Sequence, residues 1–197
     1  MWRFIPCLLL LLAGCAGTED AVVHIPPHVP APGPSGLAVS PPADIGVTEF
    51  QEAGGIGVLP GRIGERKTLG NLSMGEVTID PPPGALLRDA FVRELRAAGQ
   101  RIVSSGGDAT LGGQVRQFTL RTDVTALYWD VVVDAAVDLT VQRAGRTGGG
   151  GFTAHCQERT YSWPGSEIIA RVVGTCVDDL ARQFRDNADI ARVLGGR

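Results

Sequence analysis

The sequence has no apolar run long enough to cross a membrane as a helix. Its most apolar stretch, residues 4–13, holds ten residues, whereas a spanning helix needs about 20. The chain also lacks a strong excess of one charge, because its formal net charge is -3 at pH 7. This balance gives no reason to expect a nucleic acid or an anionic surface as a partner.

Residue patterns that support catalysis are also scarce. The sequence contains neither GxxxxGK[ST] nor GxGxxG, and His155 is the only histidine beyond the proline-rich segment. In a strand, His155 would point to the opposite side from Cys156, so the pair does not form a catalytic dyad. His24 and His28 are separated by two prolines, which prevent a helix that would join them at a metal. We therefore expect no enzymatic activity, no cofactor and no metal site.

The N-terminal residues resemble a secretory signal. Arg3 precedes the apolar residues 4–13, and small residues follow up to Cys15. The sequence LAGC at residues 12–15 resembles a bacterial lipobox, which implies removal of residues 1–14 and acylation of Cys15. Two or more acyl chains anchor a protein stably. Because Ala16 rather than aspartate follows Cys15, the resemblance implies the outer membrane, with the protein on its periplasmic face.

Proline dominates the next segment. Residues 15–43 show little apolar periodicity and contain Pro26, Pro27, Pro30, Pro32, Pro34, Pro41 and Pro42. Such a composition favours a solvated polyproline II conformation over a packed element. We expect residues 15–43 to be a lipidated tether and residues 44–197 to form one periplasmic domain.

Two cysteines remain once Cys7 is removed with the signal and Cys15 carries lipid. They are Cys156 and Cys176. An exported protein meets an oxidising compartment, so the pair is a disulfide candidate; two buried free thiols are the alternative. Both side chains fall on apolar faces, Cys156 in a predicted strand and Cys176 in a predicted helix. A bond between that strand and that helix is therefore reasonable.

Apolar periodicity predicts the elements of the domain. Helices are expected at residues 84–98 and 165–185, with a further short turn of helix at 190–194. Strands are expected at residues 45–50, 56–59, 76–79, 101–103, 109–122, 129–142 and 151–161. The strand at 129–142 is the clearest, because every second residue from Val131 to Val141 is apolar. The pattern predicts an α+β fold, with a single, mainly antiparallel sheet and two helices packed on one face.

The sequence contains two conspicuous groups of polar residues. Asp130, Asp134 and Asp138 share the polar face of one strand, but steps of four residues place them about 13 Å apart, too far to share a metal or proton. We expect a solvated face, with Arg116, Arg121 and Arg159 as cross-strand partners. The glycine-rich and arginine-rich loop at residues 60–67 is a structural loop whose Arg62, Arg66 and Lys67 are candidates for contact with an anionic partner.

Three segments resemble uncharacterised YajG-like lipoproteins of the Gram-negative envelope. They are RKTLG at residues 66–70, LRDAFVRELRAAG at 87–99 and DATLGGQV at 108–115. The resemblance spans roughly residues 56–185 and implies no catalytic residues, whereas the proline-rich segment and the Cys156/Cys176 pair depart from it. We expect a non-enzymatic accessory that assists an envelope assembly or transport complex through protein contacts. The alternative is a carrier or sensor of a small amphiphile, such as a lipid or glycan. A cavity under the helices would favour the carrier.

Overall fold

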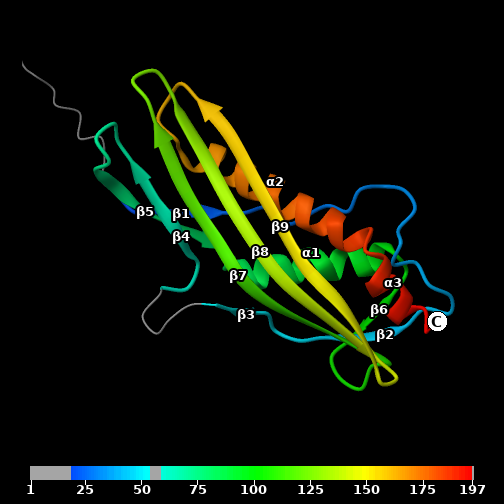
Figure 1. Ribbon diagram of the computed structural model, residues 1–197. Coiled ribbons are helices and arrows are strands. Elements are labelled where there is room, and N and C mark those ends of the chain that lie inside the picture. The colour runs from blue at the N-terminus through cyan, green and yellow to red at the C-terminus, as the bar shows by residue number, and fades with distance from the viewer. Residues whose placement is uncertain (1–18, 54–58, 197) are drawn as a thin grey trace, which may run out of the picture.

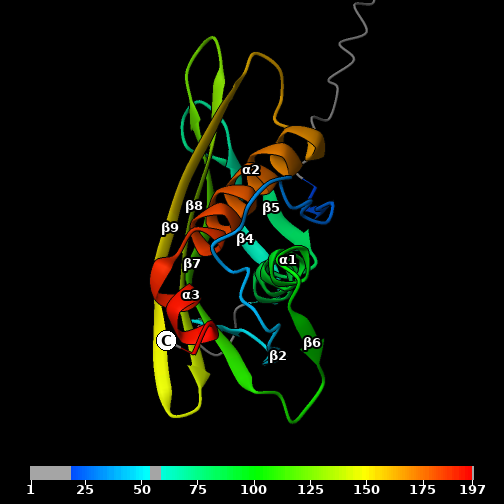
Figure 2. The same ribbon diagram turned by 90° about the vertical axis from the view of Figure 1, so that its right-hand side faces the viewer.

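The computed structural model describes residues 19–53 and 59–196. In this part of the chain, a nine-stranded sheet is covered on one face by three helices (Figures 1 and 2). No helix of residues 19–53 and 59–196 lies on the opposite face of the long strands (Figure 2). The α+β prediction is confirmed, whereas the number of helices and the strand directions differ from expectation.

Three long strands form the backbone of the sheet. They are β7 (Ala109–Val124), β8 (Trp129–Arg143) and β9 (Arg146–Thr160), joined by two tight turns into an antiparallel meander. Alternation along β8 sets its orientation, because Val131, Val133 and the following apolar residues at period two are buried against the helices. The strands predicted at 109–122, 129–142 and 151–161 are therefore confirmed.

The other edge of β7 bonds to several short strands in succession. From the start of β7 to its end, the partners are β2 (Asp44–Val47), β3 (Gln51–Glu52) and β4 (Arg62–Lys67), all parallel to it. Beyond them, β6 (Arg101–Val103) is parallel to β2, and β5 (Ser73–Asp80) is antiparallel to β4. The prediction of a mainly antiparallel sheet is thus wrong in this half, where the sheet is mixed. The strand predicted at 56–59 lies mostly outside the described residues.

The helices fill the space behind the sheet. They are α1 (Pro83–Ala97), α2 (Ser166–Arg185) and the short α3 (Ala188–Leu194). Phe91 of α1 lies between Phe184 and Phe50, with ring centroids 4.8 and 5.9 Å apart, respectively. The predicted turn at 190–194 is a full third helix, which begins where the Asn187 side chain accepts hydrogen bonds from the first backbone N–H groups.

The proline-rich segment is packed on the domain, contrary to the predicted tether. Its first strand, β1 (Ala21–His24), pairs in parallel with β5. Ile25 and Leu37 are fully buried in the same core as the helices. The prolines break regular structure, but the apolar residues between them have enough free energy of burial to dock the segment. Of the described chain, residues 19–43 therefore belong to the domain, and Cys15 lies outside the described part.

His28 fixes this segment to both long helices. Its Nε2 lies 2.8 Å from Oε1 of Glu94 on α1, and its Nδ1 lies 2.6 Å from Oδ1 of Asp178 on α2. The side chains of His28 and Glu94 are 5% and 3% exposed. His24, by contrast, lies on the surface beside Asp80. The two histidines thus make separate contacts, and no helix brings them together.

Candidate functional site

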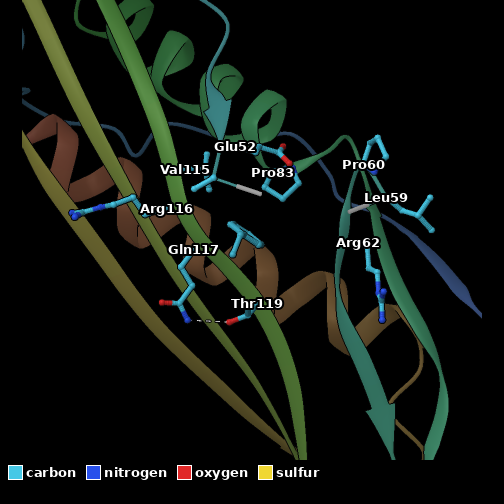
Figure 3. Close-up of a pocket in the computed structure, with 11 residues that line it drawn as sticks. Glu52, Leu59, Pro60, Arg62, Pro83, Val115, Arg116, Gln117 and Thr119 are labelled. Carbon is cyan, nitrogen blue, oxygen red and sulfur yellow. Dashed lines mark hydrogen bonds between the residues drawn. The ribbon is translucent and has the colours of Figure 1, made fainter. Parts of the chain in front are cut away.

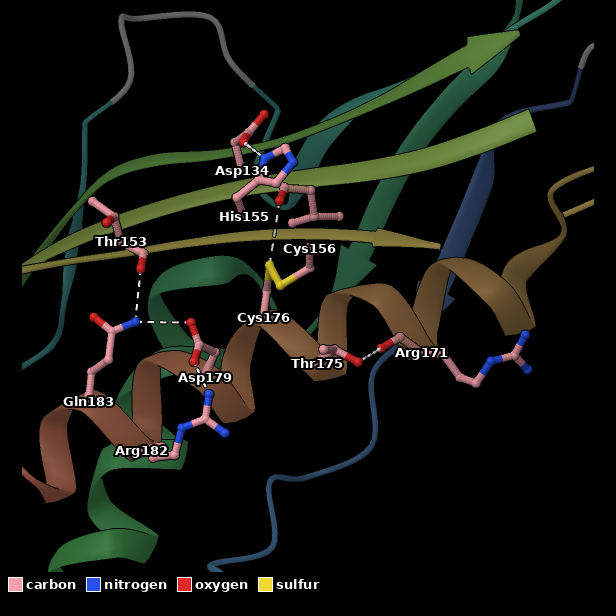
Figure 4. The surroundings of a disulfide bond; sticks show 11 residues. Asp134, Thr153, His155, Cys156, Arg171, Thr175, Cys176, Asp179, Arg182 and Gln183 are labelled. Carbon is pink, nitrogen blue, oxygen red and sulfur yellow. Dashed lines mark hydrogen bonds and ion pairs between the residues drawn. A yellow bond between two sulfur atoms is a disulfide. The ribbon is translucent and has the colours of Figure 1, made fainter. Parts of the chain in front are cut away.

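A disulfide joins the sheet to the longest helix. Cys156 of β9 and Cys176 of α2 are bonded, with their Cα atoms 5.7 Å apart (Figure 4). Both cysteines are buried, and Cys176 lies against the backbone of β8 at Val133. The predicted pairing is present in the structure. It fixes α2 against β9 in the middle of the helix.

Beside the disulfide, β9 forms a long edge of the sheet. Among the described strands it bonds only to β8, over 15 residues without a register shift. Gln183 of α2 donates a hydrogen bond of 2.9 Å to the backbone oxygen of Thr153 (Figure 4). This contact shows that the Thr153 peptide groups point away from β8. Since strand residues alternate, Gln157 directs its own N–H to the same open side.

The edge has few of the features that usually protect one. Natural edge strands are blunted by proline, lysine, bulges or short length. Between Thr147 and Gln157, β9 contains no proline, lysine or acidic residue, and four consecutive glycines occupy residues 148–151. A strand of this kind offers backbone donors and acceptors to another strand.

The polar face of the meander carries a ladder of ion pairs. Arg159 donates two hydrogen bonds to Asp130, at 2.8 and 2.9 Å, while Arg121 pairs with Asp134 and Arg116 with Asp138. All three predicted arginine partners are confirmed.

The pKa values of two of these carboxyls reflect their partners. The hydrogen bond from Arg159 lowers the pKa of Asp130. The hydrogen bond from His155, followed by that from Arg121, lowers the pKa of Asp134. In each case the partner favours the charged carboxylate. The carboxylates are satisfied by their partners and are spread along the strand; Asp130 is buried, whereas Asp134 and Asp138 are partly exposed.

His155 belongs to this outer face. Its Nδ1 lies 2.6 Å from Oδ1 of Asp134, whereas Cys156 points inward to its disulfide (Figure 4). The two neighbours point oppositely, as the strand alternation predicts. Among the described residues, no group of three or more histidine, cysteine or acidic side chains is placed to hold a metal ion.

The predicted basic loop is a strand, and its cations are engaged. Arg62, Arg66 and Lys67 lie in β4, because residues 62–67 pair with β5 on one side and meet β7 on the other. Arg62 is 2.8 Å from Glu76, and Lys67 is 3.1 Å from Glu65.

Arg66 differs from its two neighbours because it is buried. It donates a hydrogen bond to the backbone oxygen of Glu19 and lies over the ring of Trp163. These contacts give Arg66 a structural role. The three side chains do not converge on one anion site.

A hollow opens where the sheet divides between β3 and β4. It has a volume of about 370 Å³ and is lined by residues of β3, β4, β7 and the start of α1, including Glu52, Arg62, Pro83 and Phe118 (Figure 3). On this edge β7 pairs with β3 up to Val115 and with β4 at Leu120, so within the described chain the intervening residues have a strand partner, β8, on their other side only. Residues 54–58, which are not described, connect β3 to β4.

The region under the helices is filled by side chains. Leu87 and Phe91 of α1 and Ile169 and Leu180 of α2 are fully buried in one continuous core. The hollow at the divided sheet is partly polar and open to solvent, and it is separate from this core. Among the residues described, no helix is both long and apolar enough to cross a bilayer.

Two features were missed from sequence. The buried pair of His28 and Glu94 joins residues 66 positions apart, so no local pattern marks it. The second is a group of aromatic residues at one end of the molecule, where Tyr128, Trp129, Tyr161 and Trp163 meet in pairs. A usable signal existed, since these aromatics flank the ends of two predicted strands.

The fold is that of an α+β protein for which similar structures have been solved. A Xanthomonas campestris protein assigned to the family DUF330 superposes with a TM-score of 0.58 and 14% identity, covering 88% of this chain and 95% of that chain. An uncharacterised protein gives a TM-score of 0.52 and 17% identity, covering 88% of this chain and 97% of that one. At this identity, the two matches establish a shared fold only.

A looser match is a minor lipoprotein from Acinetobacter baumannii. Its TM-score is 0.39 and its identity 15%, covering 71% of this chain and 96% of that chain, which is too low to support an argument. No family model matches the sequence, and no curated protein matches it significantly.

Proposed function

We propose that this protein is a lipid-anchored accessory of the bacterial envelope, acylated at Cys15, which binds a protein partner and catalyses no reaction. The lipobox-like residues 12–15 support the anchor. Ala16, which stands after Cys15 in place of aspartate, supports a position at the periplasmic face of the outer membrane. The relation to YajG-like lipoproteins stays a prediction.

The open edge of β9 is the observation that carries the partner-binding proposal. It extends over 15 residues, bonds only to β8 among the described strands, and lacks the usual protection along its central part. Addition of a partner strand there would form main-chain hydrogen bonds without rearranging the core. The filled space under the helices favours this function over the alternative, a carrier of a small amphiphile.

A pair of substitutions at one edge position tests the partner site. Gln157→Pro removes an N–H that points away from β8 and therefore leaves the β8–β9 ladder intact. Gln157→Ala keeps the N–H and loses the same side chain. A photo-crosslinker replaces Thr147, whose backbone groups also point away from β8. The experiment uses full-length protein in intact cells. We expect a discrete adduct in the alanine variant and its loss in the proline variant.

The outcomes are distinguished by stability and mass. Thermal unfolding midpoints are measured for both variants. A midpoint equal to that of the parent shows that any loss of the adduct comes from the changed edge and not from unfolding. If the proline variant unfolds, it is replaced by Thr153→Pro with Thr153→Ala as its control, because the backbone groups of Thr153 also point to the open side. An adduct that survives both edge changes contradicts this partner site. Absence of acyl mass on Cys15 contradicts the anchor.

A further inference from the structure

Three connecting segments meet at one end of the molecule (top of Figures 1 and 2), and their apolar side chains form an exposed surface there. The segments are the β4–β5 turn, the β7–β8 turn and the chain that follows β9. We call this surface the aromatic end; its exposed residues are Leu69, Leu72, Leu127, Tyr161 and Trp163, and the half-buried Tyr128 adjoins them. Leu127 and Tyr161 are 77% and 75% exposed, so large apolar side chains gather there in water.

Contacts between the three segments hold this end together. The backbone N–H of Lys67, just before the β4–β5 turn, donates to the Thr122 hydroxyl near the end of β7 at 2.8 Å. Across the other two segments, the ring centroids of Tyr128 and Tyr161 are 6.3 Å apart, and those of Trp129 and Trp163 are 6.1 Å apart. The aromatic end is therefore one surface rather than three separate loops.

Two arginine side chains lie against aromatic rings of this end. The guanidinium of Arg159 lies 3.7 Å from the centroid of the Tyr128 ring, and that of Arg66 lies 5.2 Å from the Trp163 ring. Such cation–π contacts orient the rings. Asp123, just before the β7–β8 turn, has its carboxylate 3.6 Å from Arg121, which partly neutralises it.

The described chain begins at the same end. The backbone oxygen of Glu19 accepts a hydrogen bond from Arg66, and the Asp20 carboxylate accepts one of 2.9 Å from the backbone N–H of Glu76. Cys15 precedes Glu19 by four residues, which span at most about 14 Å. An acyl group on Cys15 therefore keeps this end of the domain close to the leaflet that holds the lipid.

We propose that the aromatic end docks on the phospholipid surface of the leaflet that holds the acylated Cys15. The leucines enter the region below the headgroups, and Tyr128, Tyr161 and Trp163 lie at headgroup level. The proposal rests on the lipid anchor proposed above and adds a second, protein-made contact with the membrane. It sets the long strands upright on the bilayer and leaves the β9 edge facing sideways for a partner.

The side chains of the aromatic end are of the kinds that favour the interface between lipid headgroups and acyl chains. Leucine side chains gain free energy when they leave water. Tyrosine and tryptophan favour the membrane interface, because one end of each ring system is apolar and the other forms hydrogen bonds. A protein partner would use the same apolar side chains, but the short connection to Cys15 places membrane lipid nearest to them.

Tryptophan fluorescence provides a direct test. The sequence contains three tryptophans, Trp2, Trp129 and Trp163, and Trp2 is lost with the signal, so both tryptophans of the processed chain report on the aromatic end. The acylated, processed protein is reconstituted in phosphatidylethanolamine and phosphatidylglycerol vesicles whose acyl chains are brominated near the headgroups. We expect emission about twofold lower than in unbrominated vesicles, because bromine quenches tryptophans at the interface.

Matched leucine and valine variants separate docking from simple proximity. Leu72→Ser with Leu127→Ser should reduce the quenching by at least about half, since the two exposed leucines supply apolar burial. Val29→Ser replaces a valine that is 81% exposed beside α2, far from this end, and should leave the quenching unchanged. Each single leucine variant is measured as well, and unfolding midpoints confirm that every variant is folded.

The failures of the anchor and of the docking are distinguishable. If mass spectrometry finds no acyl group on Cys15, the proposed function itself fails. If the acylated protein binds vesicles but its tryptophans are not quenched, the docking is overturned while the anchor stands. Equal quenching in the parent and the double leucine variant also overturns it, because the apolar side chains then contribute nothing.

Discussion

The imidazole of His28 and the buried carboxylate of Glu94 lie 2.8 Å apart and hold the proline-rich segment against α1. The second ring nitrogen faces Asp178 on α2, and an imidazolium is able to donate from both nitrogens. One residue therefore connects the N-terminal segment to both long helices. The contact explains how a chain with seven prolines between residues 26 and 42 stays on the domain.

His28→Ala should strongly destabilise the protein. The change leaves the buried carboxylate of Glu94 without its histidine partner, and removal of one member of a buried pair costs on the order of 3 kcal/mol. Chemical denaturation measures the free energy of unfolding. The matched control is His24→Ala, whose exposed contact with Asp80 is worth less than about 1 kcal/mol. Similar losses in both variants would contradict this role of His28.

Reduction of the disulfide should lower stability without unfolding the core. The bond between Cys156 and Cys176 closes a loop over a sequence separation of 20, and a crosslink of that size contributes on the order of 3 kcal/mol. The unfolding midpoint is measured with and without reductant. In a double Cys156→Ala, Cys176→Ala variant, reductant should have no effect. An unchanged midpoint for the reduced parent would show that the bond adds little.

The ion pair of Asp130 predicts a loss of stability in acid. Arg159 lowers the pKa of this carboxyl in the folded state, so the pair stabilises the fold above the unfolded value of about 3.9. As the pH falls below that value, the carboxyl becomes protonated and the stabilisation is lost. The stability difference between the parent and Asp130→Asn should therefore shrink between about pH 6 and about pH 2.5. Asp123→Asn serves as the exposed control. A constant difference for Asp130 would exclude the pair as its source.

Two glycine substitutions should change stability in opposite directions. A Cβ on Gly64 would lie 1.9 Å from the backbone oxygen of Leu120, at the point where β4 bonds to β7. Gly64→Ala should cost more than about 2 kcal/mol, because the strands must separate. Gly174 lies within α2 and faces open space where a methyl group would lie, so Gly174→Ala should stabilise by up to about 1 kcal/mol. Thermal unfolding measures both, and a tolerated Gly64→Ala would contradict the close approach.

Local periodicity explains which elements the sequence predicts. The alternation in β8 and the apolar stripe of α2 depend on residues within one element, so both are visible without knowledge of their partners. Strand order and direction are not local. The parallel pairing of β2, β3 and β4 along one edge of β7 depends on contacts between distant residues. The sheet was therefore predicted as too uniformly antiparallel.

The proline-rich segment shows the same limit. Its composition correctly excludes a long helix, but it does not exclude docking. Val23 and Ile25 are buried because β5 offers a free edge more than 50 residues later in the chain. A short alternation of apolar residues around Val23 was the available signal.

Prediction of the site residues was uneven for a similar reason. The pairing of Cys156 with Cys176 followed from two local faces, each directed to the core. The cations of residues 62–67 were assigned to a loop, because glycine and arginine obscure a strand whose partners are far away in sequence. The acid–arginine ladder was predicted correctly because adjacent long strands must bring their polar faces together.

The parallel register of β1 and β5 has a mechanical consequence. Residues 21–24 align with residues 77–80, and the ladder continues with a hydrogen bond of 2.9 Å from Ile25 N–H to the Asp80 oxygen. A force applied to the chain ahead of β1 acts along the strand axis. It therefore loads the β1–β5 hydrogen bonds in shear, all at once, instead of peeling them apart one by one. An edge strand in this geometry transmits tension from its N-terminal side into the sheet, and the domain resists extraction by a pull from that end.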